Sequence, residues 1–110
     1  MSTDTDRIRF LNDQLRQNLP GGRAVITPGI AALGPEAVAR LIRTIAVFDD
    51  FSHANDPYQE HDAGSFKFDD EIEVIFKIDY FDRSLNFHSR DPADPSVTTR
   101  VITVMRADEY

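Results

Sequence analysis

The 110-residue sequence contains no cysteine, which excludes a disulfide framework, a thiolate metal site and a cysteine nucleophile. It also lacks any apolar run near the roughly 20 residues that a membrane-spanning helix needs. Its first ten residues lack the apolar centre of a secretory signal peptide. We therefore expect a cytoplasmic protein with no membrane association.

Motifs typical of phosphate-binding and hydrolytic enzymes are missing as well. There is no Gly-Lys-Ser/Thr phosphate loop, no Gly-x-Gly-x-x-Gly and no Gly-x-Ser-x-Gly nucleophile elbow. Gly21-Gly22 follows a helical pattern, so we interpret it as a helix C-cap and turn. A set of catalytic residues scattered along the chain stays open, but no local motif indicates one.

Positive charge is scarce in the middle of the chain. Residues 49–73 hold nine acidic residues against one lysine, whereas residues 1–48 carry a net charge of +2 and residues 74–110 carry −1. The net charge of −7 therefore originates in one short segment. Because phosphate backbones repel such a segment, we do not expect direct nucleic-acid binding, and a basic protein partner or a small cationic ligand fits better.

The first half of the chain predicts two helices and one strand. Apolar residues at helical spacing indicate a helix over residues 5–18, and the β-branched segment 23–27 indicates a short strand that ends at Pro28-Gly29. Gly34-Pro35 opens a second helix that ends near Phe48.

The second half alternates between apolar and polar residues, which predicts strands. A hairpin is expected from residues 66–68 and 72–80 around an Asp69-Asp70 turn, followed by a short strand at 85–87 and a last strand at 97–106. Between the last two strands, Asp91-Pro-Ala-Asp-Pro predicts a stiff connector.

These elements predict one α+β domain over residues 1–110. We expect two helices packed on one face of a mostly antiparallel sheet of about five strands, a two-layer sandwich. An exposed strand edge, at 97–106 or 23–27, would allow pairing into a homodimer.

Several short motifs are distributed over nearly the whole length. They are Leu11-Asn12-Asp13, Gly21-Gly22-Arg23, Phe48-Asp49-Asp50-Phe51, Asn55-Asp56-Pro57, Glu60-His61-Asp62 with Gly64, Lys77-Ile78-Asp79-Tyr80 with Asp82, Asp91-Pro92-Ala93-Asp94-Pro95 and Thr99-Arg100-Val101. With these motifs the sequence resembles a family of small bacterial proteins, mostly alphaproteobacterial, that is catalogued only as a domain of unknown function. The resemblance implies no assigned activity and brings no catalytic residues.

The acidic loop 49–64 has neither helical nor strand periodicity. Structureless stretches of this length in compact domains are usually functional or disordered. We expect Phe48, Phe51 and Tyr58 to hold this loop against the sheet in one shape.

Within the loop, Glu60-His61-Asp62 is the sharpest cluster. His61 could act as a proton shuttle or metal ligand oriented by a carboxylate, with Asp79 and Asp82 as further carboxylates. We favour a structural role, in which His61 bonds a backbone carbonyl and the acids cap turns, because consecutive residues in extended backbone point in opposite directions. We assign no metal ligand, and weak divalent binding stays a hypothesis.

Arg100 lies in a predicted strand, and a buried arginine needs a carboxylate partner. The acidic loop is the obvious supplier, so we expect an Arg100–carboxylate pair. Tyr80 shares the apolar face of its strand, and we expect its ring in the core with the hydroxyl at the rim.

We interpret the chain as a non-enzymatic binding or accessory module that uses the 55–64 loop and the strand end at Asp79–Asp82. The expected binding residues are Asn55, Asp56, Glu60, His61, Asp62, Asp79, Tyr80, Asp82 and Arg100. One alternative is a small enzyme, metal-assisted or not, that uses His61 with Asp62 or Asp79. A second is an inhibitor protein that mimics nucleic acid, although nine acids without an acidic helix are few for mimicry. The sequence identifies no cofactor.

Overall fold

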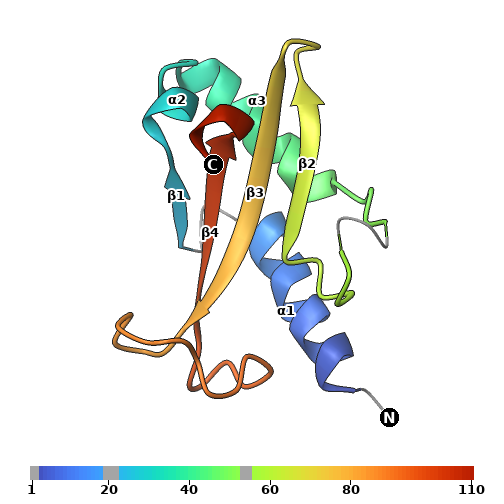
Figure 1. Cartoon of the computed structure of the whole chain (residues 1–110), viewed down its shortest axis with the longest axis vertical. Helices are drawn as coiled ribbons and strands as arrows, with labels where there is room; N and C mark the ends of the chain where they lie inside the picture. Colours follow the sequence, from blue (N-terminus) through green and yellow to red (C-terminus); the bar gives the residue numbers. More distant parts are fainter. Residues whose placement is uncertain (1–2, 19–22, 53–55) are drawn as a thin grey trace.

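The computed structural model describes residues 3–18, 23–52 and 56–110 of the chain (Figure 1). Gly21-Gly22 and Asn55 lie outside the described residues. The elements in chain order are α1 (Asp4–Gln17), β1 (Ala24–Ile26), α2 (Pro28–Ala31), α3 (Pro35–Val47), β2 (Ala63–Phe68), β3 (Ile72–Phe81), β4 (Thr99–Arg106) and the 3-10 helix η2 (Ala107–Glu109).

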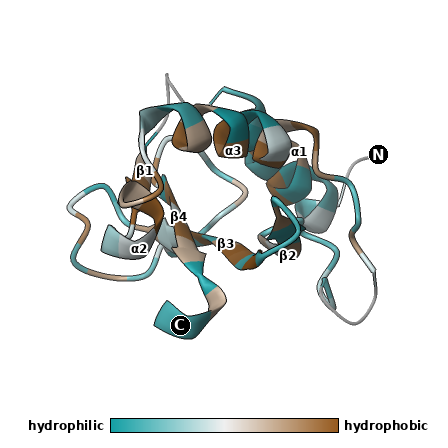
Figure 2. Cartoon of the chain, turned by 90° about the horizontal axis from the view of Figure 1, so that it is seen from above, coloured by the Kyte–Doolittle hydropathy of each residue, from teal (hydrophilic) through white to brown (hydrophobic). Residues whose placement is uncertain are grey.

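The fold is α+β, as predicted, with α1 and α3 on the same face of the sheet (Figure 2). Leu41 and Ile45 of α3 are buried against Phe76 of β3 and Ile102 of β4. These side chains follow the two periods that the sequence predicts, 3.6 for the helix and 2 for the strands. The shared core fixes α3 and the sheet relative to each other.

The sheet differs from the prediction in strand number and direction. Among the described residues it has four strands in the order β1-β4-β3-β2, and β1 is parallel to β4 while the other pairs are antiparallel. The sheet is therefore mostly antiparallel, as predicted, but it has four strands in the described ranges, where about five were expected, and its parallel pair was not foreseen. Periodicity marks a segment as a strand, but its neighbours are chosen by contacts between distant parts of the chain.

The missing strand is the segment 85–87. Instead of extended backbone it forms a turn, in which Leu85 has a φ of 63° and only Phe81 and His88 make an isolated bridge. Pro28-Gly29, where the first strand was expected to end, begins the short helix α2, because proline is favoured in the first helical turn.

The two free edges of the sheet are β1 and β2. β4 is hydrogen-bonded on both sides, so the expectation that segment 97–106 offers an edge for dimer pairing was wrong. β1, the other expected edge, exposes Val25 and Ile26. Within the described ranges, no helix combines the length and the apolar content needed to cross a membrane.

The connector before β4 is held against α1. The Arg7 side chain donates a hydrogen bond from Nε to the carbonyl of Ala93 at 2.9 Å, and Ala93 is buried. Asp91 accepts a bond from the Ala93 amide, and Asp94 accepts one from the Ser96 amide. The Asp91-Pro-Ala-Asp-Pro segment is therefore a loop held by hydrogen bonds, in agreement with the stiff connector that its prolines predict.

Helix α1 buries a stripe that is not purely apolar. Its buried residues are Ile8, Asn12 and Arg16, which recur every four residues and so lie on one helix face. A buried amide and a buried guanidinium must find hydrogen-bond partners inside the protein. Those partners define the candidate functional site.

Candidate functional site

The acidic loop lies against α1 and is tied to it through backbone carbonyls. Arg9 donates from Nε to the carbonyl of Gln59 at 2.8 Å, and Asn12 donates from Nδ2 to the carbonyl of Glu60 at 3.0 Å. Gln59 and His61 both have left-handed backbone conformations, with φ of 58° and 56°. Such conformations cost energy in residues with a side chain, so the bonds to α1 stabilise a compact loop.

Two of the three aromatic residues expected to hold the loop do so. The Phe51 ring packs edge-on against Phe48 with centroids 5.0 Å apart, and Phe48 packs edge-on against Phe76 of β3 at 5.3 Å. Tyr58 is 73% exposed, so its expected contribution was wrong. The loop is anchored near its start, through Phe48 and Phe51.

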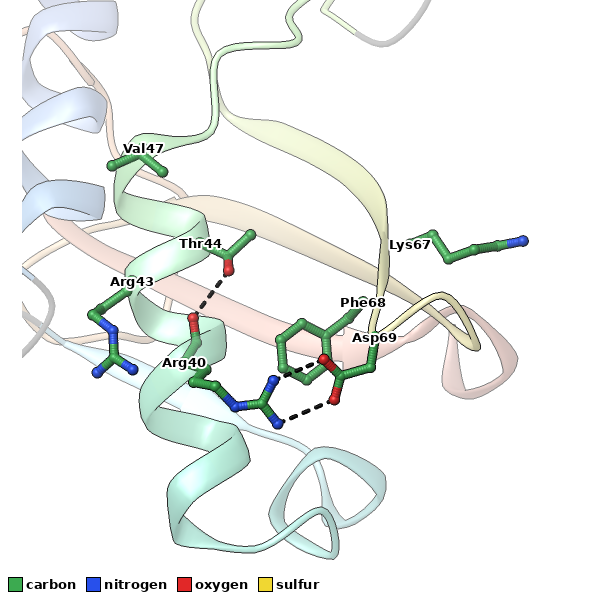
Figure 3. A pocket seen from close by; sticks show the side chains of 7 residues that line it. All are labelled: Arg40, Arg43, Thr44, Val47, Lys67, Phe68 and Asp69. Atoms are coloured by element: carbon green, nitrogen blue, oxygen red, sulfur yellow. Dashed lines mark hydrogen bonds and ion pairs between the residues drawn. The ribbon is translucent and has the colours of Figure 1, made fainter.

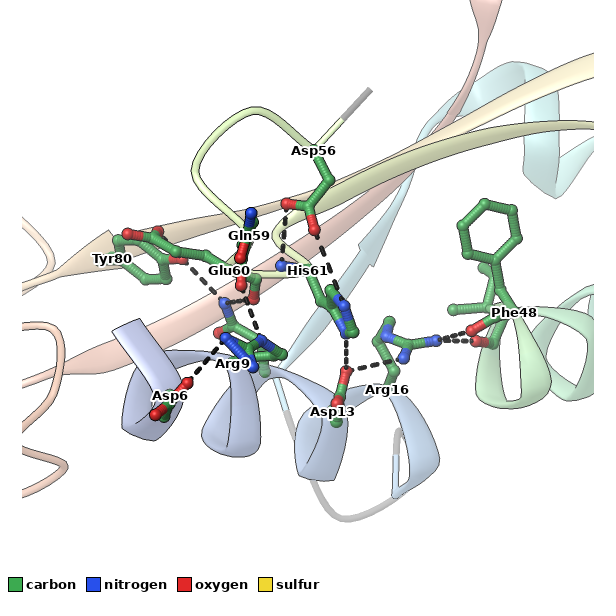
Figure 4. A network of polar contacts seen from close by, with 12 residues as sticks. Asp6, Arg9, Asp13, Arg16, Phe48, Asp56, Gln59, Glu60, His61 and Tyr80 are labelled. Atoms are coloured by element: carbon green, nitrogen blue, oxygen red, sulfur yellow. Dashed lines mark hydrogen bonds and ion pairs between the residues drawn. The ribbon is translucent and has the colours of Figure 1, made fainter. Parts of the chain in front are cut away.

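His61 lies between the carboxylates of Asp13 and Asp56 (Figure 4) and also stacks on an aromatic ring. Its Nδ1 lies 2.9 Å from Oδ1 of Asp13, and its Nε2 lies 3.7 Å from Oδ2 of Asp56. The imidazole stacks on Phe51 with centroids 3.8 Å apart and an interplanar angle of 5°. The expected bond to a backbone carbonyl is replaced by a carboxylate from α1, and the ring's orientation is fixed from three sides.

Asp56 was expected in the site and contributes in two ways. Its carboxylate accepts a hydrogen bond from the His61 amide at 3.1 Å and also faces the His61 ring. Asp56 therefore caps the loop and is itself buried.

Arg16 connects this cluster to the end of α3. The buried guanidinium donates from Nη1 to the carbonyls of Ile45 and Phe48, at 2.8 and 2.9 Å, and from Nη2 to Oδ1 of Asp13 at 2.8 Å. A cation at a helix C-terminus satisfies carbonyls that have no partner within the helix. Asp13 therefore compensates a buried positive charge and orients His61 with the same oxygen.

A second branch of the network starts at Arg100. It donates to Oδ1 of Asn12 at 2.8 Å and to the carbonyl of Pro92, and its guanidinium lies 5.1 Å from the Tyr80 ring centroid. The expected carboxylate partner is replaced by an amide oxygen and a carbonyl. Burial lowers the pKa of Arg100, and the nearby Tyr80 and Glu60 raise it in part.

Asn12 is the junction of this branch. It donates from Nδ2 to the Tyr80 hydroxyl at 2.8 Å, and that hydroxyl donates to Oε1 of Glu60 at 2.8 Å. Burial raises the pKa of Tyr80, although the hydrogen bond from Asn12 opposes the shift. The Tyr80 ring is in the core and its hydroxyl is a hydrogen-bonded link in the network.

The remaining predicted acids lie at the edge of this cluster or outside it. Asp62 is half-buried, and burial followed by the charges of Glu60, Asp56 and Asp79 raises its pKa. Asp79 pairs with Lys77, whose Nζ lies 3.4 Å from its carboxylate. Asp82 caps its own turn, accepting bonds from Ser84 and two backbone amides. Asp79 is thus close enough to influence Asp62, whereas Asp82 has a separate role.

Two hollows flank the His61–Phe51 stack. The first, which we call the α1–α3 pocket, has a volume of about 470 Å³ and lies between α1 and the end of α3. Its lining comprises Asp13, Arg16, Gln17, Ala46, Val47, Phe48, Asp49, Phe51 and His61. The second has a volume of about 340 Å³ and is lined by Arg9, Phe51, Ser52, Asp56, Gln59 and His61. The stack therefore separates two recesses that a ligand could enter.

Sequence reasoning placed the site on the loop but missed the α1 residues that hold it. Asn12 bonds to the loop, to β3 and to β4, and Asp13 contacts the loop through His61. Arg16 bonds to the end of α3. A signal was present, because polar residues at positions 12 and 16 interrupt the apolar spacing that begins at Ile8. Large polar residues on the buried face of a helix indicate an internal network.

Within the described part of the chain, no three histidine or acidic side chains are grouped so as to hold a metal ion. The side chains of Asp13, Asp56 and His61 lie close together. However, Asp13 is ion-paired with Arg16, and the two nitrogens of the His61 ring face Asp13 and Asp56. The expectation of weak divalent binding stays a hypothesis.

Comparison with known proteins gives one match. A family model with the description "Protein of unknown function (DUF3768)" matches residues 26–109. No curated protein and no solved structure matches the chain. The matched range contains the acidic loop and the whole β2–β4 region but not α1, which supplies Asn12, Asp13 and Arg16.

Proposed function

The chain belongs to the family of proteins of unknown function DUF3768, and since that description assigns no activity, we propose from the site itself that this protein is a binding module. Its ligand is a cationic side chain, arginine or lysine, presented by a basic partner protein. The cation enters the α1–α3 pocket, and the carboxylates in residues 56–62 of the acidic loop attract the partner from beside it. The observation that carries the proposal is a carboxylate oxygen of Asp13 and the carboxylate of Asp49, neither bonded by a described residue, beside exposed apolar surface.

The carboxylates belong to Asp13 and Asp49. Oδ1 of Asp13 accepts from Arg16 and contacts His61, while no described residue bonds its Oδ2. Asp49 is exposed and forms no ion pair with the described part of the chain. A guanidinium or ammonium group is the natural complement of such oxygens.

The apolar half of the pocket fits the stem of the same side chain. Val47 is 77% exposed, and Phe51 lines the pocket next to it. Arginine carries three methylene groups and lysine four, and these pack on apolar surface while the charged end stays in polar surroundings. One partner side chain could therefore use both Val47 and the two carboxylates.

The wall of the pocket is rigid before any ligand arrives. Arg16 bonds two carbonyls at the end of α3 and the Asp13 carboxylate, and Asp13 in turn orients His61 on Phe51. A preorganised surface loses little conformational entropy on binding, which favours affinity.

The loop adds a long-range attraction. Burial and, after it, the charges of Glu60, Asp56 and Asp79 raise the pKa of Asp62, so four carboxylates lie close enough to interact at this part of the loop. Their field increases the association rate of basic partners and falls with ionic strength.

A titration followed by amide NMR tests the proposal with two peptides, N-acetyl-Gly-Arg-Gly-amide and the matching Gly-Glu-Gly. We expect the arginine peptide alone to shift the amides of Val47, Phe48 and Asp49 and of Asp13. Asp49→Asn should weaken this binding several-fold through loss of a charge-assisted bond. Asp70→Asn, the same change on an exposed turn, is the control and should leave binding unchanged. Equal shifts with the glutamate peptide, or none with either, would overturn the proposal.

A second candidate function, a general-base enzyme, is favoured by the Asp13–His61 contact. A carboxylate at Nδ1 holds the tautomer in which Nε2 is free to accept a proton. Nε2 faces Asp56 at 3.7 Å, beyond hydrogen-bond distance, beside the hollow that Ser52 lines. This candidate expects p-nitrophenyl acetate hydrolysis that His61→Gln abolishes and His88→Gln retains; equal rates in all three proteins would reject it.

A further inference from the structure

A third pocket, between α3 and β2, has the opposite charge from the rest of the molecule (Figure 3). Its volume is about 550 Å³, and its lining comprises Arg40, Arg43, Thr44, Val47, Lys67, Phe68 and Asp69. Three cations and one carboxylate therefore gather in one place on a chain whose net charge is −7. Cations concentrated against the overall charge favour an anionic ligand.

Arg40 occupies the centre of this pocket in a fixed orientation. Its guanidinium lies 5.1 Å from the centroid of the Phe68 ring, which is buried, so the cation rests on an aromatic face. Its two terminal nitrogens donate to the two carboxylate oxygens of Asp69, at 2.7 and 3.1 Å. The planar fork is thus already aligned to bind an oxyanion through two parallel bonds.

The carboxylate that now occupies the fork is weakly held. Arg40 and Asp69 are 49% and 47% exposed, and exposed ion pairs contribute little to stability. Asp69 also has a left-handed backbone, with φ of 52°, in the turn between β2 and β3. The Arg40 guanidinium holds the pKa of Asp69 below its usual range, so this carboxylate is ionised at neutral pH and imitates an external anion.

Two further cations stand beside this pair without partners. Figure 3 shows Arg43 and Lys67 on opposite sides of the Arg40–Asp69 pair. Within the described part of the chain neither forms an ion pair. In Figure 3 both side chains point away from the Arg40–Asp69 pair, so they add positive potential around the pocket without contacting the fork.

We propose that this pocket binds a small phosphate monoester at the Arg40 fork, with Asp69 as an internal competitor that the phosphate displaces. An external carboxylate would gain no binding energy by displacing Asp69, because Arg40 would exchange one carboxylate partner for another. A phosphate monoester carries up to two negative charges and three acceptor oxygens, so it binds the Arg40 fork more strongly than a carboxylate does, and Arg43 and Lys67 add to the positive potential around it. Val47, at the rim, offers apolar surface to the organic group. The proposal is independent of the cation site, because the two pockets select opposite charges.

Amide NMR titrations at neutral pH and low salt test this proposal with inorganic phosphate and phenyl phosphate as the probes. We expect both to shift the amides of Arg40, Phe68 and Asp69, and phenyl phosphate to bind more tightly because its ring contacts Val47. Val47→Ser should remove the advantage of phenyl phosphate and leave inorganic phosphate unaffected. If inorganic phosphate alone binds, the ligand is free phosphate and not a monoester, and that part of the proposal is wrong.

Charge-matched variants separate this site from general electrostatic attraction. Arg40→Gln should weaken phosphate binding about tenfold, since hydrogen bonds to charged groups are lost. Arg83→Gln removes the same charge at the turn after β3 and should not change the affinity. Asp69→Asn should tighten binding by up to about fivefold, the equivalent of one surface ion pair, whereas Asp70→Asn should not.

The Asp69 result is decisive, because only a competitor bound at the fork predicts a gain in affinity. If Asp69→Asn and Asp70→Asn bind phosphate equally, or if Arg83→Gln weakens binding as much as Arg40→Gln, the site is not at Arg40. Circular dichroism melting of each variant verifies that it is folded, which the exposure of the pair leads us to expect.

Discussion

Asn12 shows how much one buried polar residue can determine in a small protein. Its side chain is 0% exposed and makes hydrogen bonds to Tyr80, Arg100 and the carbonyl of Glu60. These partners come from β3, β4 and the acidic loop, so a single amide aligns three parts of the chain with α1. Each of those groups would lose a partner if the amide were removed.

We therefore predict that Asn12→Ala lowers the free energy of unfolding by about 3 kcal/mol, the cost of leaving buried polar groups unsatisfied. Urea unfolding at neutral pH measures the change. Asn18→Ala is the matched control, because among the residues that the structure describes the Asn18 side chain bonds only the carbonyl of Gln14, on the exposed end of α1, and its cost should stay below about 1 kcal/mol. A similar cost for both variants would contradict the role given to Asn12.

Arg16 and His61 illustrate the same dependence from the other side of α1. The guanidinium satisfies carbonyls at the end of α3, and the imidazole is positioned by Asp13 and Phe51. Neither side chain forms the proposed binding site by itself. Arg16 and His61 contribute to it together, because both contact the carboxylate of Asp13.

At the scale of elements, the β2–β3 hairpin supplies one side of the proposed phosphate site, and α3 supplies the other. Its turn contains Asp69 and Asp70, both with positive φ, of 52° and 60°, and the Glu71 amide bonds the Phe68 carbonyl. Successive left-handed residues characterise the type I′ turn, which favours glycine at the second position. Aspartate tolerates this backbone at a cost.

We predict that Asp70→Gly raises the free energy of unfolding by about 1 kcal/mol, because glycine adopts the left-handed conformation without strain. Thermal and urea unfolding should agree on the gain. Glu73→Gly, at an exposed position in the interior of β3, should instead lower stability by about 1 kcal/mol. A loss at position 70 would show that the aspartate side chain matters more than the backbone strain.

The whole molecule separates its charges in space. The acidic loop and its carboxylates face α1, whereas the cations of the α3–β2 pocket lie on the opposite side of Val47, which lines both pockets. A chain with a net charge of −7 therefore still has a positively charged recess between α3 and β2. Bulk electrostatics favours basic partners, and local geometry adds a site for an anion.

The stability of the whole molecule should fall at alkaline pH because of Tyr80. Burial raises its pKa above that of a free tyrosine, which is about 10. Above that pH the unfolded chain loses the phenolic proton while the folded protein retains it, so ionisation favours unfolding and the melting temperature should decline. Below pH ~10 the contribution is fully present.

Melting curves across alkaline pH, with tyrosinate absorbance, measure this effect. Of the three tyrosines, Tyr80 should ionise only as the protein unfolds. Tyr80→Phe should be less stable at neutral pH, because the bonds to Asn12 and Glu60 are lost, and should show a shallower alkaline decline. If all three tyrosines, including Tyr80, ionise in the folded protein near the pKa of a free tyrosine, the prediction is wrong.

The sequence by itself determined the local structure and the charge pattern. The apolar spacing predicts α1 and α3, the alternation of residues 66–80 predicts the hairpin, and the excess of acids identifies the loop around His61. These are properties of neighbouring residues, because helix and strand periods and net charge need no distant contact.

Only the tertiary structure decided the partners. It paired β1 with β4 in parallel, gave Arg100 an amide in place of a carboxylate, and brought Asp13 to His61 across 48 positions of sequence. Hydrogen bonds and ion pairs of this kind depend on which buried groups meet when the core closes, and many arrangements satisfy the same local pattern. The two proposed sites are formed by such meetings, of α1 with the acidic loop and of α3 with β2.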